Sequence, residues 1–280
     1  MIFFWLLSKL PLWILYRFSD FIYLLIRYII KYRIEIIRSN ITNSFPTSSP
    51  QAVSTLINRF YRNFSDQITE TIKMYSISAS ELDRRVIVKN KELILQYLDH
   101  GQSTLVVAPH MFNWEWMVTV ARLKTPYPYH PAYRPLKNKF FDQLLIRMRS
   151  RFGGKPTVGK ELVEMMKTEP SPIGYSLMID FVAAKPELWM NFLNQETVFD
   201  LSIEKLAAET GFPVIYPKMT KPKRGHYVLE LIEISKPGYD GSWPLMKKFV
   251  GEIEKTINEQ PETFLWSHRR WKYKKPLPVI

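Results

Sequence analysis

Apolar runs of strand length alternate with amphipathic segments along most of the chain, and this alternation constrains the fold more than any other feature. The runs are nearly continuous, whereas the segments between them repeat their apolar residues every three or four positions. Such alternation is typical of an α/β domain, so we predict a mixed sheet flanked by helices. The predicted strands and extended segments are 84–90, 103–109, 127–134, 174–180, 188–194, 213–219 and 226–234. The predicted helices are 48–78, 91–101, 114–124, 138–154, 160–169, 202–211 and 243–260.

The first forty residues have a different character, because they are dense in Phe, Trp, Tyr, Leu and Ile. A membrane span needs about 20 mostly apolar residues, and charges, including Arg17 and Arg27, interrupt this segment. On one helix these charges would fall within a narrow arc between wide apolar faces. That pattern suits a helix lying in, or dipping obliquely into, a membrane surface. We therefore expect a membrane-associated helix over residues 1–40 and one domain of catalytic size over 41–280; the alternative is a core helix that the domain covers.

The charge balance is strongly basic, with 39 Lys and Arg residues against 26 Asp and Glu residues and a net charge of +13. Such an excess favours a polyanionic partner: an anionic membrane, a phosphorylated substrate, an acidic protein or nucleic acid. The absence of cysteine excludes disulfides, thiolate zinc sites and a cysteine nucleophile. No two histidines are three or four residues apart, the spacing that puts two metal ligands on one helical face. We therefore predict no metal.

Residues 154–161, GKPTVGKE, nearly match the phosphate-binding loop pattern GxxxxGK[ST]. Glu161 stands where the pattern has a hydroxyl that holds magnesium, and a carboxylate there repels phosphate. We predict a loop before a helix rather than a nucleotide site. The chain also lacks the GxSxG pattern of a serine nucleophile and the HExxH pattern of a zinc protease.

His110 and Glu115 are the strongest candidates for chemistry. The apolar run STLVVAP ends directly before His110, which should therefore project from the carboxyl end of a buried strand, where α/β sheets place binding crevices. Glu115 falls in the first turn of the next predicted helix, where the helix dipole favours a carboxylate. A hydrogen bond between them would fix the imidazole tautomer and leave the other ring nitrogen as a general base. A core histidine beside a helix-start glutamate is the alternative, because the spacing alone is common.

Five blocks, in order along nearly the whole chain, resemble those of the bacterial lipid A biosynthesis acyltransferases, within the glycerolipid-type acyltransferase superfamily. HMFNWEWM, which contains His110 and Glu115, is similar to the family's His-x4-Asp/Glu block. AYRPLKNKFFDQLL is similar to the second block, with Arg134 in Tyr-Arg-Pro, and GYSLMIDF occupies the place of a strand that ends in an aspartate, here Asp180. TGFPVIYPKM and FLWSHRRWK resemble the fourth block and the closing signature.

The resemblance implies acyl transfer from a thioester, usually of acyl-carrier protein, to a hydroxyl of a lipid A precursor at the cytoplasmic face of the inner membrane. His110 would then be the general base and Glu115 its support. Arg134 would bind acceptor phosphate or stabilise the oxyanion, and Asp180 and Asn113 complete the expected substrate-binding residues. The acyl thioester is the co-substrate, and no cofactor is implied. The expected partners are the carrier protein, a lipid acceptor and an anionic membrane surface, but not nucleic acid.

Two departures from the family pattern leave the acceptor open. Phe181 follows Asp180 where relatives often carry a polar or amide residue, and residues 192–207 lack the glycines expected around that loop. One alternative is therefore acylation of a lysophospholipid or aminolipid, with acyl-CoA as the donor. Another is a non-enzymatic basic protein that binds membrane or nucleic acid, although such a protein has no need of the pair formed by His110 and Glu115.

Overall fold

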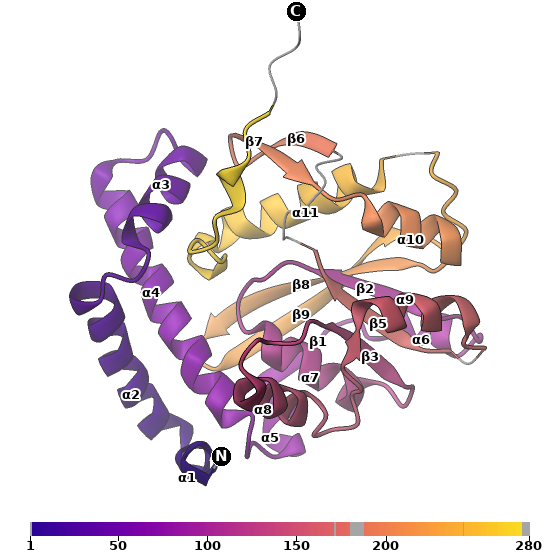
Figure 1. Cartoon of the computed structure of the whole chain (residues 1–280), viewed down its shortest axis with the longest axis horizontal. Helices are drawn as coiled ribbons and strands as arrows, with labels where there is room; N and C mark the ends of the chain where they lie inside the picture. The colour runs from indigo at the N-terminus through magenta and orange to yellow at the C-terminus, as the bar shows by residue number, and fades with distance from the viewer. Residues whose placement is uncertain (1, 171, 180–187, 243, 276–280) are drawn as a thin grey trace, which may run out of the picture.

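A seven-stranded sheet forms the centre of the protein (Figure 1). The computed structural model describes residues 2–170, 172–179, 188–242 and 244–275. The strands are β1 (Val86–Val88), β2 (Thr104–Ala108), β3 (Tyr129–Tyr133), β4 (Thr157–Val158), β5 (Gly174–Met178), β8 (Val214–Lys223) and β9 (His226–Ser235). Their order is β1-β9-β8-β2-β5-β3-β4, and neighbours are parallel except for the antiparallel pair β8 and β9. The predicted mixed sheet is thus confirmed.

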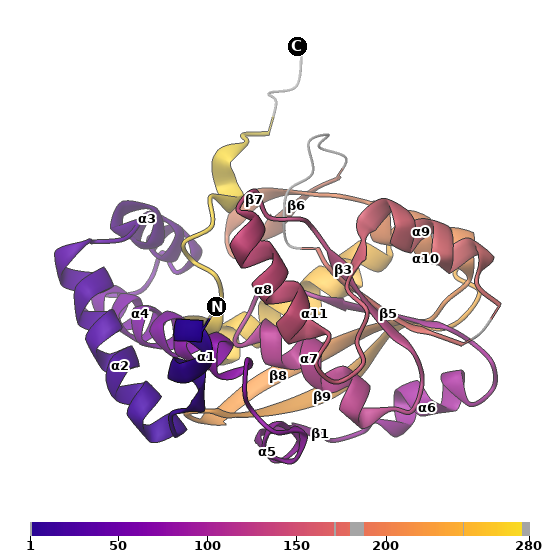
Figure 2. The ribbon, with the colours of Figure 1, turned by 60° about the horizontal axis from the view of Figure 1, so that its bottom comes forward.

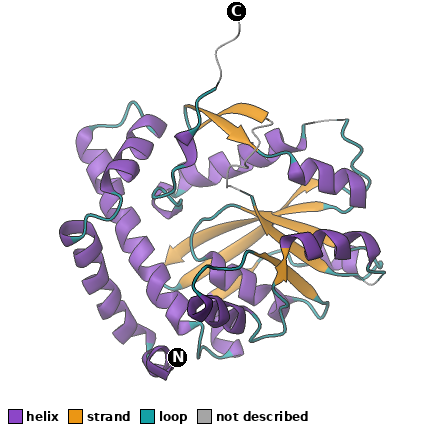
Figure 3. Cartoon of the chain, in the orientation of Figure 1, coloured by secondary structure: helices purple, strands orange, loops and turns teal. Residues whose placement is uncertain are grey.

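Helices cover both faces of this sheet (Figure 3). They are α4 (Pro50–Lys73), α5 (Ala79–Arg85), α6 (Glu92–Leu98), α7 (Trp114–Lys124), α8 (Lys139–Arg149), α9 (Gly159–Thr168), α10 (Ser202–Thr210) and α11 (Leu245–Glu259). Successive side chains of a strand point to opposite faces of the sheet, and two neighbouring residues of β8 meet helices on opposite faces. The hydroxyl of Tyr216 donates to Thr256 of α11 at 2.9 Å, whereas the next residue, Pro217, faces a cavity that α7 also lines.

The N-terminal residues form several helices rather than the single helix that the charge pattern predicts. Pro11 separates the first two helices. Lys31 and Arg33 have φ angles of 52° and 51°, a left-handed backbone that no helix continues through. The elements of this arm are α1 (Ile2–Lys9), α2 (Leu12–Leu24), the π-helical turn η1 (Leu25–Ile29) and α3 (Ile34–Ser44).

The arm lies along α4, and α2 runs beside that helix (Figure 1). Leu15 and Ser19, on the inner face of α2, are 0% and 1% exposed. On the opposite face Trp13 and Phe21 are 68% and 64% exposed. Within the described residues no helix combines the length and the hydropathy that crossing a membrane requires.

A small two-stranded sheet packs against the carboxyl-terminal segment. Its strands are β6 (Leu188–Phe192), which overlaps a predicted strand, and β7 (Gln195–Phe199), which the sequence patterns do not predict. The two residues between them, Leu193 and Asn194, both have positive φ, as a two-residue hairpin turn requires. Arg270 of the closing signature is only 3% exposed, and its guanidinium lies 5.5 Å from the ring centroid of Phe192. This part of the signature therefore packs inside the protein.

Candidate active site

Three neighbouring parallel strands, β2, β5 and β3, end at the same edge of the sheet. His110 comes two residues after the end of β2, and Arg134 directly follows β3. Because the carboxyl ends of parallel strands meet at one edge, the fold brings these two sequence-predicted residues to the same side of the sheet. Asp180 follows β5 in sequence but lies outside the described residues.

The turn from β2 into α7 carries His110 and is held by the carboxyl-terminal segment. Phe112 has a φ of 52°, a left-handed conformation that costs energy for a bulky side chain. Its backbone N–H donates to the carbonyl of Thr263 at 2.9 Å, and Met111 forms an antiparallel bridge with Phe264. Residues about 150 positions away in sequence thus fix the backbone that carries the histidine.

Asn113 ends this turn and caps α7. Its side-chain oxygen accepts a hydrogen bond from the backbone N–H of Trp116 at 3.0 Å, as an N-cap residue does. Its side-chain nitrogen donates to Glu70 at 2.7 Å. Asn113 is fully buried, so both polar groups act inside the protein and shape the turn. Direct contact of Asn113 with a substrate stays a prediction.

Glu70, on α4, is a buried neighbour of the site that the sequence patterns do not single out. Besides Asn113, its carboxylate accepts hydrogen bonds from the hydroxyls of Tyr16 at 2.9 Å and Tyr227 at 2.6 Å. Glu70 is fully buried, and this burial raises the pKa of its carboxyl above the ordinary value. The sequence does contain a signal for Glu70, because Asp66 and Glu70 lie four residues apart on one face of a predicted amphipathic helix. Carboxylates on a buried face require hydrogen-bonding or charged partners.

Glu115 lies in the first turn of α7, as predicted, and Arg149 of α8 binds it with two parallel hydrogen bonds of 2.8 and 2.7 Å. The Glu115 residue is only 6% exposed, so the ion pair is largely shielded from water. Burial by itself would lower the pKa of Arg149, but the adjacent carboxylate outweighs that effect and raises it. The sequence does not single out Arg149. Its only signal is that Arg149 lies four residues after Leu145, so the two share the inward face of the helix.

Trp114 connects the two residues predicted to be catalytic. The half-buried ring of His110 packs edge-on against the Trp114 ring, with centroids 5.0 Å apart. The indole N–H of Trp114 donates to Glu115 at 3.1 Å. Glu115 is therefore engaged by Trp114 and Arg149, and a direct hydrogen bond between His110 and Glu115 stays a prediction.

Exposed cations follow β3 at the same edge, and we call them the basic rim. None of them forms an ion pair with a carboxylate of the described residues. The segment is held in shape by Asp142, which accepts hydrogen bonds from the backbone N–H of Leu136 at 2.6 Å and from the Tyr133 hydroxyl. The basic rim comprises Arg134, Lys137 and Lys139.

An apolar cavity of about 420 Å³ lies beside Trp114 and Glu115. Ile68 and Ile72 of α4 line it on one side, and Leu145 of α8 lines it on the other. We call it the α4–α8 cavity. It places an apolar space directly next to a buried ion pair at the edge of the sheet.

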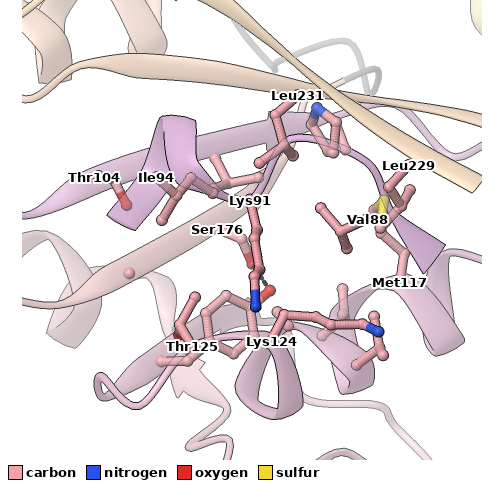
Figure 4. Close-up of a pocket in the computed structure, with 18 of the residues that line it drawn as sticks. Val88, Lys91, Ile94, Thr104, Met117, Lys124, Thr125, Ser176, Leu229 and Leu231 are labelled. Carbon is pink, nitrogen blue, oxygen red and sulfur yellow. Dashed lines mark hydrogen bonds between the residues drawn. The ribbon is translucent and has the colours of Figure 1, made fainter. Parts of the chain in front are cut away.

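A narrower apolar cavity, of about 70 Å³, lies on the sheet face that α6 and α7 cover (Figure 4). Thr104 and Ala108, at the two ends of β2, both line it, so it follows the strand toward the turn that carries His110. The buried Thr104 hydroxyl has no hydrogen-bond partner among the described residues. Lys91 and Lys124 border this cavity.

The described residues contain no cluster of three or more His, Asp or Glu side chains placed to hold a metal ion. What they offer is a half-buried imidazole, a carboxylate fixed by a guanidinium, and exposed cations beside an apolar space. These groups suit proton abstraction from a substrate that combines hydrocarbon with negative charge.

Comparison with known families agrees with this chemistry. A model of the bacterial lipid A biosynthesis acyltransferase family matches residues 1–273, a range that includes both the arm and the closing signature. A comparison with curated proteins finds no match. Because the family match covers nearly the whole chain, the protein belongs to the bacterial lipid A biosynthesis acyltransferase family.

Proposed function

We propose that the protein moves a fatty acyl chain from an acyl thioester, carried by acyl-carrier protein, to a hydroxyl of a lipid A precursor. The observation that carries the proposal is the half-buried imidazole of His110 at the strand edge, beside the shielded pair of Glu115 and Arg149. The imidazole supplies a base, the neighbouring cavity accepts hydrocarbon, and the basic rim attracts phosphate.

His110 starts the reaction by removing the proton of the acceptor hydroxyl as its oxygen attacks the thioester carbonyl. The new carbon–oxygen bond forms, the carbon–sulfur bond breaks, and the departing thiolate takes the proton back from the imidazolium. A positioned base of this kind contributes a factor of about 10²–10⁴ in rate. No covalent acyl-enzyme is needed, which fits a chain without cysteine.

Glu115 and Arg149 act on His110 through Trp114 in this proposal. Their ion pair fixes the carboxylate, the carboxylate holds the indole N–H, and the indole ring, packed at 80° to the imidazole, sets the plane of the imidazole. Arg134 then stabilises the oxyanion or binds acceptor phosphate, because a guanidinium suits either anion. We also propose that Asp180 and Asn113 take part in substrate binding.

The partners follow from charge and exposed surface. A carrier protein is acidic, and a net charge of +13 speeds its encounter with the enzyme. The outward face of the arm carries large exposed side chains such as Phe3, Trp13 and Ile29, at 69%, 68% and 74% exposure. Apolar surface of this extent, with cations beside it, is typical of proteins that lie on an anionic membrane. We propose that the arm rests on the cytoplasmic face of the inner membrane.

The experiment is a mass-spectrometric transfer assay of the wild type beside His110→Ala. Carrier-protein and CoA thioesters are offered with a lipid A precursor, a lysophospholipid and an aminolipid. We expect a product one acyl chain heavier from the precursor and the carrier-protein thioester, and loss of about 10²–10⁴ in rate in the variant. Product from a lysophospholipid alone would replace the acceptor in this proposal, and wild-type turnover by His110→Ala would exclude the proposed base.

A further inference from the structure

We propose that the α4–α8 cavity binds a hydrocarbon chain of the lipid acceptor, while the basic rim holds the acceptor's anionic headgroup. This inference rests on the proposed acyl transfer and adds how the acceptor reaches the site, namely sideways from the bilayer. It is carried by the size and lining of the cavity, by the surface on which its mouth opens, and by the cations beside that mouth.

The cavity is a suitable space for a flexible apolar chain. Its volume of about 420 Å³ compares with about 70 Å³ for the cavity along β2. Ile72 of α4 and Leu145 of α8 line it from two helices, and Trp114 and Glu115 line it next to the histidine turn. Transfer of a chain from water into such a lining is favourable. A lipid bound this way would have its headgroup at the edge of the sheet that carries His110 and Arg134.

Phe4 of α1 and Phe141 of α8 both line the cavity. Because Phe141 is exposed, the cavity reaches the surface where these two helices meet, and we call this opening its mouth. Figure 2 shows α1 and α8 in front of the sheet. Phe4 of α1 lies 6.2 Å, between ring centroids, from each of Phe140 and Phe141 of α8. Phe140 and Phe141 are 40% and 45% exposed, and neighbouring Phe3 is 69% exposed. A chain that slips between these rings therefore passes from one apolar surface to another without crossing water.

Cations stand beside this mouth, where a headgroup would lie. Leu136, which lines the cavity, is part of the same short segment as Arg134 and Lys137. On α8, the Arg147 guanidinium lies 5.9 Å from the ring centroid of Tyr75, another residue of the cavity lining. Within the described residues none of these cations has a carboxylate partner, so an anionic phosphate is the complementary ligand.

The position of the mouth favours the acceptor over the donor. A carrier protein delivers its acyl chain from water, whereas a lipid acceptor stays in the membrane. An entrance beside the exposed rings of Phe3, Phe140 and Phe141 suits a molecule that is already in the bilayer.

Photolabelling of the whole chain, without any acyl donor, tests the binding step. The probe is lysophosphatidic acid with a diazirine near the end of its single chain, because it combines one hydrocarbon chain with a phosphate. We expect label on peptides from α4 and α8, and less label when unlabelled lipid A precursor competes. Label confined to the outer face of the arm, or to strands around the narrow cavity, would overturn the proposal. This readout needs no acyl transfer.

Leu145→Trp tests the same site by filling it, and Leu93→Trp, at a partly buried position on α6, is the matched control. In Leu145→Trp we expect the KM for the lipid acceptor to rise about tenfold, with kcat and the donor KM within about twofold of wild type. The control should keep all three constants. An unchanged acceptor KM, or an altered preference for donor chain length, would overturn the proposal. If the wild type transfers no acyl chain at all, the proposed function fails, and the photolabelling still decides the cavity.

Discussion

The arm and the sheet domain are both rich in large apolar residues, but they place them differently. In β2 the apolar side chains point into the core, and Leu105 and Val107 are 0% exposed. In α2 the largest side chains point away from the protein, and Trp13 and Phe21 are 68% and 64% exposed. Composition alone therefore does not decide which apolar residues a fold buries, and the arm leaves an exposed apolar surface, which we propose meets the membrane.

The seam between the two regions combines buried apolar side chains, such as Leu15, with a network of polar groups. Asp66 of α4 accepts hydrogen bonds from Ser19 of α2 at 2.7 Å, from Lys221 at 3.2 Å and from Arg224 at 2.6 Å. Arg224 also binds Asp20 of α2 at 2.8 Å. The charged stripe of the arm thus faces inward in part, toward the hairpin of β8 and β9. This seam reaches the active site as well, because Glu70 joins the arm to the cap of α7.

Arg149→Met should give the largest effect, because it leaves the buried Glu115 carboxylate without its cation. Breaking a buried ion pair from one side typically costs about 3–5 kcal/mol. We expect a loss of that size in the free energy of unfolding, measured in urea, together with a large loss of acyl transfer.

The double variant Arg149→Met with Glu115→Leu separates stability from catalysis. Replacing both partners of a buried pair by apolar residues is often close to neutral, so most of the lost stability should return. Activity should not return, because the carboxylate that holds Trp114 is gone. Recovery of transfer in the double variant would contradict the role that we propose for Glu115.

Asp66→Asn should weaken the attachment of α2 to the sheet domain, because it removes the negative charge at the centre of the seam. Hydrogen bonds to charged groups contribute about 1.5–3 kcal/mol, and we expect a loss of free energy of unfolding in that range. Asp83→Asn is the control, because Asp83 is half exposed and pairs with Lys124 at the surface. Such a pair is worth less than about 1 kcal/mol. Equal losses in the two variants would show that the seam does not depend on buried charge.

Much of the sheet domain is predictable because its signals are local. Ser49 before Pro50 predicts a helix start, and the Ser49 hydroxyl indeed accepts a hydrogen bond from the backbone N–H of Ala52 at 3.2 Å. The run before His110 forms β2, and Glu115 falls in the first turn of α7 as expected. In each case the pattern that predicts the element lies within a few residues of it.

The features that the sequence does not predict depend on distant contacts or on unusual backbone. Arg149 binds Glu115 across 34 residues, and only the packing of α8 against α7 brings them together. The breaks at Lys31 and Arg33 use positive φ in residue types that carry no turn signal. The hairpin turn before β7 also has positive φ at Leu193, where a glycine would be the usual signal. Because that glycine is absent, the sequence does not predict β7.

Glu70 should make the stability of the seam depend on pH, with a sign that follows from the burial of its carboxyl. Burial raises its folded-state pKa, whereas an unfolded chain ionises glutamate near about 4.3. Above that value the folded protein keeps a proton that the unfolded chain has lost, so stability is lost as pH rises through the folded pKa. Glu70→Gln should remove this loss. We expect the unfolding free energies of the variant and the wild type to change differently as pH rises above about 4.3; parallel changes would contradict a raised pKa.

Phe21→Ser should have the smallest effect on stability. It tests directly whether the exposed apolar residues of the arm differ in function from those of the sheet domain. Phe21 is 64% exposed on the outer face of α2, and Ile87, 52% exposed on the edge strand of the sheet, offers a matched control. Surface substitutions usually change stability by less than about 0.5 kcal/mol, so both variants should unfold like the wild type. Inserting one large apolar side chain into lipid contributes about 1.5–3 kcal/mol, so Phe21→Ser should bind anionic vesicles at least about tenfold more weakly. Ile87→Ser should bind them like the wild type, since nothing in β1 continues the apolar face of the arm. Equal loss of vesicle binding in both variants would mean that the exposed face of the arm is not the surface that meets the membrane.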